Sequence, residues 1–142
     1  NISLDIKAPR YWWSEFDTYR VGITKQSEST IHTLTKRKLT AADFNGGISQ
    51  TILDYLNTCI IKYNNAESKA EQEHIFHNIK VNLPEGYLQR RIVVCNAKTL
   101  QNIIAQRHNH RLLEWKLFCK RIYNVITDPL CTWLFPEGIL PE

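Results

Sequence analysis

The chain has 142 residues, of which 43% are hydrophobic, and a formal net charge of +4. This length suits one domain with its own core, and we expect residues 1–142 to form a single domain. Its 18 lysine and arginine residues are dispersed in small groups rather than in a dense patch, so we do not expect a nucleic-acid partner. The sequence has no apolar run long enough to span a membrane and no signal-peptide pattern, so we expect a cytoplasmic protein.

The four cysteines exclude two further kinds of structure. Cys59, Cys95, Cys119 and Cys131 lie far apart, and no C-x-x-C pair occurs. This spacing argues against a zinc site and provides no disulfide framework. We therefore expect reduced thiols and no metal, and Cys59 and Cys95 fall at ordinary core positions.

In the first half of the chain the hydrophobic pattern predicts two helices and a strand. The strand covers residues 2–7, and a helix over residues 11–20 carries Trp12, Trp13 and Phe16, which we expect to pack inward. A loop over residues 27–40 and a turn at residues 45–47 precede a second helix, residues 48–63. The apolar face of that helix is predicted to consist of Ile52, Leu56, Cys59, Ile60 and Tyr63.

The second half is predicted to alternate between helix and strand. A polar stretch from residue 64 opens a helix that ends near Lys80, because Pro84 cannot continue it. Residues 89–94 read as a strand, and Asn96 is placed to cap the next helix. A further helix covers residues 112–126. His108 and His110 at the junction are expected to be solvated turn histidines, because no third metal ligand is evident.

Arg107 is the least ordinary residue of the second half. Leu100, Ile103 and Ile104 recur at helical spacing, and Arg107 falls on the same face, so it should point inward. An arginine is rarely buried without a partner for its charge. The partner could be a bound anion or polar ring, or a core acid such as Glu114, or the head group could reach water.

Several segments together resemble the flavin-dependent thymidylate synthases of the ThyX family. The order K-x-x-L-P, then N-A-K-T-L and A-Q-R on one helix, is similar to the family's R-x-x-L-P, N-x-R-S-L and L-R. Near the start, Lys7-Ala8-Pro9 followed by RYWWSEFDTYR is similar to the family's K-A-P segment that leads into its R-H-R flavin motif. The family's serine-bearing motif would fall on residues 25–32.

This resemblance implies a role for individual residues. Arg107 would contact the pyrimidine of dUMP, and Lys80 would stand in for an arginine on its phosphate. Arg20, Asn96 and Lys98 would contact FAD, and Ser29 would match the family's serine. Glu15 stands in the place of a glutamine near the substrate. Thr18 and Tyr19 replace the first arginine and the histidine of R-H-R, which removes charge-assisted hydrogen bonds to the flavin.

The resemblance also implies a fold, a reaction and an assembly. The fold would be α+β, a ThyX-like mixed sheet packed with long helices, without the family's N-terminal region. The reaction would be methylation of dUMP to dTMP with methylenetetrahydrofolate, NADPH and reduced FAD, in a homo-oligomer that the family forms as a tetramer. The alternative is a divergent, non-catalytic module for nucleotide binding or assembly. A single-stranded nucleic-acid binder that stacks bases on Trp12 and Trp13 is a third hypothesis.

Overall fold

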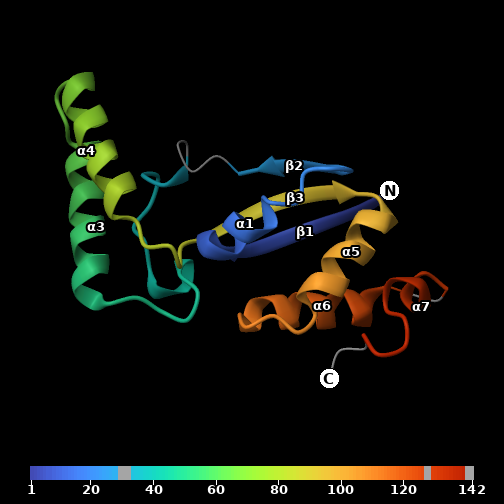
Figure 1. The fold of residues 1–142 in the computed structure, drawn as a ribbon. Coiled ribbons are helices and arrows are strands. Elements are labelled where there is room, and N and C mark those ends of the chain that lie inside the picture. Colours follow the sequence, from blue (N-terminus) through green and yellow to red (C-terminus); the bar gives the residue numbers. More distant parts are fainter. Residues whose placement is uncertain (29–32, 127–128, 140–142) are drawn as a thin grey trace. The chain divides into compact units, whose positions relative to one another are not determined.

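The computed structural model describes residues 1–28, 33–126 and 129–139. Their elements, in chain order, are β1 (Ile2–Pro9), α1 (Arg10–Phe16), β2 (Ile23–Ser27), the short 3-10 helix η1 (Ala41–Asp43), α3 (Gln50–Asn64), α4 (Lys69–Asn82), β3 (Leu88–Cys95), α5 (Ala97–Arg107), α6 (Leu113–Val125) and α7 (Leu130–Leu134) (Figure 1). The fold is α+β, as expected.

The strands form one sheet in the order β1-β3-β2, with β3 at its centre (Figure 1). The N–H of Glu28 donates to Arg90 O (3.1 Å), and the N–H of Asn96 donates to Gly22 O (3.2 Å). The first bond joins the end of β2 to the early part of β3, and the second joins the beginning of β2 to the end of β3. The two strands are therefore antiparallel. Along β1, half-buried and exposed residues alternate from Ile2 to Lys7, as the period of a strand requires.

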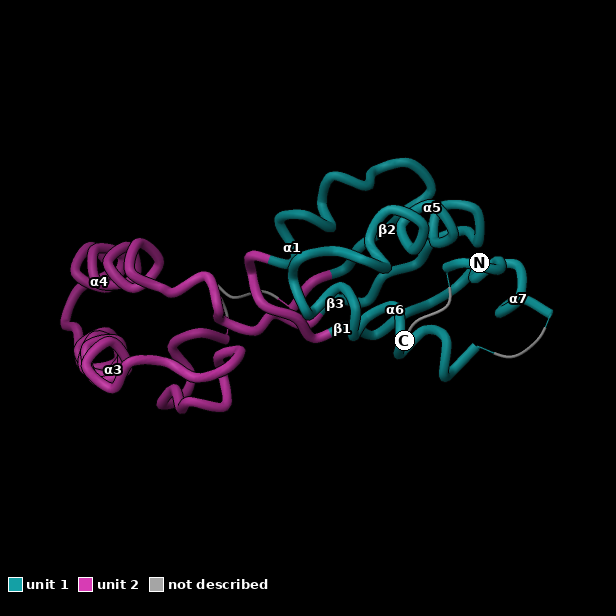
Figure 2. Tube along the Cα trace, turned by 60° about the horizontal axis from the view of Figure 1, so that its bottom comes forward, with its two compact units in different colours: residues 1–6, 12–26, 91–142 teal, residues 7–11, 27–90 magenta. Residues whose placement is uncertain are grey.

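The chain divides into two compact units, which are coloured separately in Figure 2. Unit 1 consists of residues 1–6, 12–26 and 91–142, and unit 2 of residues 7–11 and 27–90. Each unit has its own set of buried apolar side chains.

The core of unit 1 is rich in aromatic rings. Trp12, Trp13 and Phe16 of α1 and Trp115 of α6 are almost completely buried. The rings of Trp12 and Trp115 lie 4.5 Å apart between centroids, which is within the range of favourable aromatic pairs. The prediction that the tryptophans of α1 pack inward is therefore confirmed, and in this structure they are not available to stack on bases.

The core of unit 2 lies around the antiparallel pair α3 and α4 (Figure 1). The predicted face of α3 is wrong at one position, because Ile52 is exposed and its neighbour Leu53 is buried. Asn57 is also buried, and its side chain accepts from Leu39 N (2.7 Å) and donates to Leu39 O (3.0 Å). Both hydrogen-bonding functions of this buried amide are thus satisfied, and they tie the loop at Leu39 to α3.

Four elements differ from the sequence predictions. The helix expected over residues 11–20 ends at Phe16, and β2, η1 and α7 were not predicted. The remaining helices and strands lie within a few residues of their predicted ranges. No helix in the described ranges is both long and apolar enough to cross a membrane.

Candidate functional site

Arg107 is the last residue of α5 and points inward, as predicted. Only 17% of its side chain is exposed. Its Nε–H donates to the hydroxyl of Tyr19 (2.8 Å), and its Nη1 donates to Glu15 Oε2 (3.3 Å). The guanidinium also lies over the ring of Trp115, 4.9 Å from its centroid. An acid therefore meets its charge, as one of the alternatives required, and that acid is Glu15.

One carboxylate oxygen organises this cluster. Glu15 Oε2 accepts from Trp115 Nε1 (2.6 Å) as well as from Arg107, and His110 Nε2 lies 3.5 Å away. His110 Nδ1 accepts the backbone N–H of Leu112 (3.0 Å). A neutral His110 in this geometry therefore carries its proton on Nε2, which faces Glu15. We call Glu15, Tyr19, Arg107, His110 and Trp115 the arginine cluster; all five belong to unit 1.

The early end of α1 brings Tyr19 to this cluster. The N–H and the hydroxyl of Thr18 both donate to Glu15 O, at 3.2 and 2.8 Å. A threonine hydroxyl that bonds to a carbonyl three residues earlier competes with the helical ladder, which explains why the predicted helix does not continue to Arg20. The chain then turns at Tyr19 toward the C-terminal end of α5, where its hydroxyl donates to Gln106 Oε1 (2.8 Å).

The next residues follow α5 back toward its N-terminus. Thr99 Oγ1 donates to Val21 O (3.1 Å), and the N–H of Asn96 donates to Gly22 O. Gly22 has φ +72°, and a Cβ there would collide with the side chains of Asn96 and Thr99. Residues 19–22 are thereby fixed along the whole length of α5. Gly22 is the one residue of this contact that could have indicated it before the structure was known.

The described residues that were predicted to contact flavin all lie along this contact. Arg20, between Tyr19 and Val21, is exposed, and so is Lys98 in the first turn of α5. Asn96 is the predicted N-cap, and its Oδ1 accepts the N–H of Thr99 (2.8 Å). Lys98 Nζ donates to Gln101 Oε1 (3.3 Å). Ser29, the predicted match to the family's serine, lies outside the described residues.

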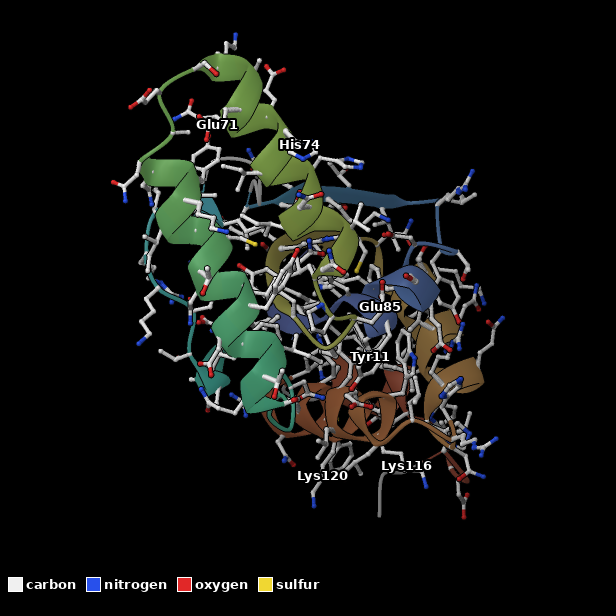
Figure 3. The ribbon with its side chains drawn as sticks, turned by 90° about the vertical axis from the view of Figure 1, so that its left-hand side faces the viewer. Tyr11, Glu71, His74, Glu85, Lys116 and Lys120 are labelled. Atoms are coloured by element: carbon white, nitrogen blue, oxygen red, sulfur yellow. The ribbon has the colours of Figure 1, made fainter. Side chains whose placement is uncertain are left out.

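Lys80 belongs to unit 2 and lies in the last turn of α4. Burial lowers the pKa of Lys80, and the nearby positive charge of Arg10 lowers this pKa further. Arg10 itself donates from Nη1 to Leu83 O (3.0 Å) and lies 3.7 Å from Glu85. The backbone N–H of its neighbour Tyr11 donates to Glu85 O (3.3 Å). The side chains of Tyr11 and Glu85 are labelled in Figure 3. Two cations therefore lie near the C-terminal end of α4.

A second polar cluster in unit 1 was not predicted. Asp17 Oδ1 accepts from Lys25 (2.6 Å) and from Arg91 (2.9 Å). The guanidinium of Arg91 lies 4.5 Å from the centroid of the Trp13 ring. These residues come from three separate segments of the chain, so no local spacing could have indicated the cluster. No group of three or more possible metal ligands was found in the described part of the chain.

Two solved structures of the flavin-dependent thymidylate synthase ThyX from Helicobacter pylori with FAD and dUMP resemble this chain. One superposes with a TM-score of 0.66 at 19% identity and covers 88% of this chain and 67% of that chain. The other has a TM-score of 0.71 at 19% identity and covers 99% of this chain and 73% of that chain. No protein-family profile and no curated protein sequence matches. The likeness shows a ThyX-like fold, which confirms the predicted architecture.

Proposed function

We propose that this chain binds FAD and a pyrimidine deoxynucleotide, and that it methylates dUMP to dTMP with methylenetetrahydrofolate and NADPH. The observation that supports this proposal most strongly is the contact between residues 19–22 and α5. It places two segments that resemble separate ThyX motifs side by side within one unit. The fold shared with two ThyX structures that contain FAD and dUMP supports the same proposal.

The chain's own residues would bind and orient the reactants. Arg107 would donate to a carbonyl of the pyrimidine, and its neighbour Glu15 would lie beside the base. Lys80 would contact the phosphate, and Ser29 is proposed at the nucleotide from the resemblance alone. These interactions supply charge-assisted hydrogen bonds and a fixed orientation, the contribution that a protein makes when a cofactor carries the chemistry.

The residues at the proposed flavin site fit an anionic cofactor. Arg20 and Lys98 are exposed cations on the two segments that the contact joins, and such cations suit the pyrophosphate of FAD. Asn96, at the start of α5, would add an amide donor or acceptor. Bound FAD would supply the one-carbon relay and the hydride, while Arg20, Asn96 and Lys98 would hold it in place.

A second candidate function is favoured by the way in which Thr18 and Tyr19 are used. Their hydroxyl groups bond to Glu15 O and Gln106 Oε1, and Arg107 bonds to Glu15. Polar atoms at positions that match flavin and substrate contacts are therefore committed to groups of the chain itself. This arrangement would suit a non-catalytic module that keeps the fold and binds a nucleotide, or serves in assembly.

The absorption spectrum of the purified chain, taken after incubation with FAD and desalting, separates the two candidates. Retention of about one FAD per chain, followed by conversion of dUMP to dTMP, would support the enzyme. Arg20→Ala and Lys98→Ala should then lose FAD, whereas Lys120→Ala should not, because Lys120 projects outward from α6 (Figure 3). Absence of retained FAD together with dUMP binding would leave the non-catalytic module.

We also propose a cytoplasmic homo-oligomer, a tetramer by resemblance, because the ThyX family builds its sites between subunits. Light scattering during gel filtration, with and without FAD and dUMP, measures the mass of the assembly. A monomer under all these conditions would contradict this part of the proposal.

A further inference from the structure

Tyr19 makes two hydrogen bonds whose directions are fixed by chemistry. Its hydroxyl donates to Gln106 Oε1 (2.8 Å) and accepts from Arg107 Nε (2.8 Å). Because the hydroxyl has a single hydrogen, which Gln106 receives, a lone pair is left to face the guanidinium. The ring also lies 5.5 Å from the guanidinium carbon. Tyr19 therefore contacts the Nε edge of Arg107 through its hydroxyl, and its ring lies near the same guanidinium.

The other contacts of Arg107 hold it less firmly. Glu15 accepts from Nη1 at 3.3 Å, which is long for a charge-assisted hydrogen bond. Trp115 covers one face, at 4.9 Å from the guanidinium carbon to the ring centroid, without fixing rotation in the plane. The bond from Nε to Tyr19 is the shortest of these polar contacts. A hydrogen bond at Nε restricts rotation of the guanidinium, and it thereby restricts the directions of the remaining N–H donors.

We propose that Tyr19 is a positioning residue for Arg107, and that its hydroxyl aims the guanidinium at the pyrimidine base. This inference rests on the proposed function, in which Arg107 contacts the base. Tyr19 itself touches Arg107 and not the ligand. The chain thus uses the tyrosine that replaces the histidine of the R-H-R motif to orient a second binding residue.

The test compares two ligands that differ by the base. Tyr19→Phe removes one oxygen and keeps the ring, so the aromatic packing remains. We expect its affinity for dUMP to fall by about tenfold, the usual effect of losing a hydrogen bond to a charged group. Its affinity for 2-deoxyribose 5-phosphate, which has no base, should not change. Calorimetric titration measures the affinity for each ligand. If Tyr19 had a purely structural role, Tyr19→Phe would bind both ligands more weakly.

Two other variants complete the series. Gln106→Ala removes the acceptor of the Tyr19 proton from an exposed position, and we expect a smaller loss of dUMP affinity. Tyr123→Phe is the matched control, because Tyr123 is exposed on α6 and its ring packs on Phe135. The control should bind dUMP like the parent chain. Equal dUMP affinity of Tyr19→Phe and the parent would overturn the inference.

A measurement without nucleotide separates this inference from the proposed function. The NMR signal of the Arg107 Nε–H, identified by its loss in Arg107→Lys, should exchange slowly in the parent chain and rapidly in Tyr19→Phe. If the parent does not bind dUMP but shows this difference, the proposed function fails and the positioning of Arg107 by Tyr19 stands. If the exchange rate is the same in both proteins, the positioning role is wrong.

Discussion

The two units each contain an arginine paired with a carboxylate, and the pairs are built differently. In unit 2, Arg37 donates to both oxygens of Asp43 (2.9 and 2.5 Å), six residues away in the chain. In unit 1, Arg107 reaches Glu15 from 92 residues away through one contact. The exposed fractions of the two pairs are reversed: Asp43 is the covered partner in unit 2 (12%, against 62% for Arg37), and Arg107 in unit 1 (17%, against 34% for Glu15).

The Arg37–Asp43 pair closes a loop, whereas the Arg107–Glu15 pair brings together residues from distant parts of the chain. Asp43 also accepts the N–H of Thr40 (2.8 Å), so the hydrogen bonds to its carboxylate come from Arg37 and Thr40, within one short stretch of chain. Glu15 instead joins α1 to α5, to α6 and to the turn at His110. A covered cation among aromatic rings is suited to receive a polar ring or a carbonyl, whereas a covered carboxylate bonded on both oxygens has its hydrogen-bonding capacity largely filled.

The largest expected effect comes from removing the two arginines in turn. Arg107→Ala should weaken dUMP binding by about a hundredfold, which corresponds to about 2.7 kcal/mol, because it deletes the proposed contact to the base. Arg37→Ala should leave dUMP affinity unchanged and lower Tm by a few degrees, since it opens a loop. Calorimetric titration with dUMP and thermal melts of both variants measure these effects.

The same variants can also show that the two arginine–carboxylate pairs do not differ in their roles. If Arg107→Ala binds dUMP like the parent and only lowers Tm, then the Arg107–Glu15 pair is structural, like that of Arg37 and Asp43. The melts should be made with and without dUMP, because a structural pair would lower Tm by the same amount in both conditions. A loss of dUMP affinity in Arg37→Ala would equally contradict the distinction.

A smaller effect is expected from pH, through Asp43. The hydrogen bond from Arg37 is the main cause that lowers the pKa of Asp43 below its usual value. A carboxyl group whose pKa is lower in the folded state stabilises the fold above its unfolded pKa, about 3.9. This stabilisation is lost as the pH falls through the folded pKa. We expect Asp43→Asn to cost about 1–3 kcal/mol at neutral pH and to make Tm less sensitive to acid.

Thermal melts between neutral pH and pH 3 measure this effect. Asp54→Asn serves as the control, because Asp54 is exposed on α3 and accepts only from the nearby Gln50 side chain (2.8 Å) among the described residues. It should keep the acid sensitivity of the parent chain. An Asp43→Asn variant with the same Tm profile as the parent would show that the Arg37–Asp43 pair adds no stability.

The sequence predictions were correct where they depended on residues that lie close together in the chain. Helical periodicity placed Arg107 on an inward face, and the capping preference of asparagine placed the start of α5 at Asn96, because both depend on neighbours within a few residues. The sequence could not name Glu15 as the acid that pairs with Arg107, because the two residues lie 92 positions apart and only the tertiary fold brings them together. The ion pairs of Asp17 were missed for the same reason.

Errors in local structure had local physical causes. One position on the face of α3 was predicted wrongly because Ile52 and Leu53 are both apolar, and periodicity alone cannot choose between them. β2 has only one apolar residue, Ile23, and its ladder is formed with β3 rather than by a pattern of its own. The helix predicted to reach Arg20 ended early because Thr18 bonds to Glu15 O.

The smallest predicted effect compares the helix caps of the two units. Asn96 Oδ1 accepts from Thr99 N (2.8 Å) in unit 1, and Ser68 Oγ accepts from Glu71 N (3.1 Å) in unit 2. Figure 3 labels Glu71 in the first turn of α4, with His74 about one turn further along. Replacing either cap by alanine should cost about 1 kcal/mol of stability. In the proposed function only Asn96 also contacts FAD, so only Asn96→Ala should release FAD as well.

Asn96→Asp separates the two roles of that residue. Aspartate caps a helix as well as asparagine does, so Tm should stay close to that of the parent. The carboxylate would lack the amide donor and would repel the anionic cofactor, so FAD retention should fall even though the helix is intact. Ser68→Asp, the matched change in unit 2, should alter neither Tm nor FAD retention. If Asn96→Asp retains FAD like the parent, Asn96 is only a cap, and its likeness to Ser68 is complete.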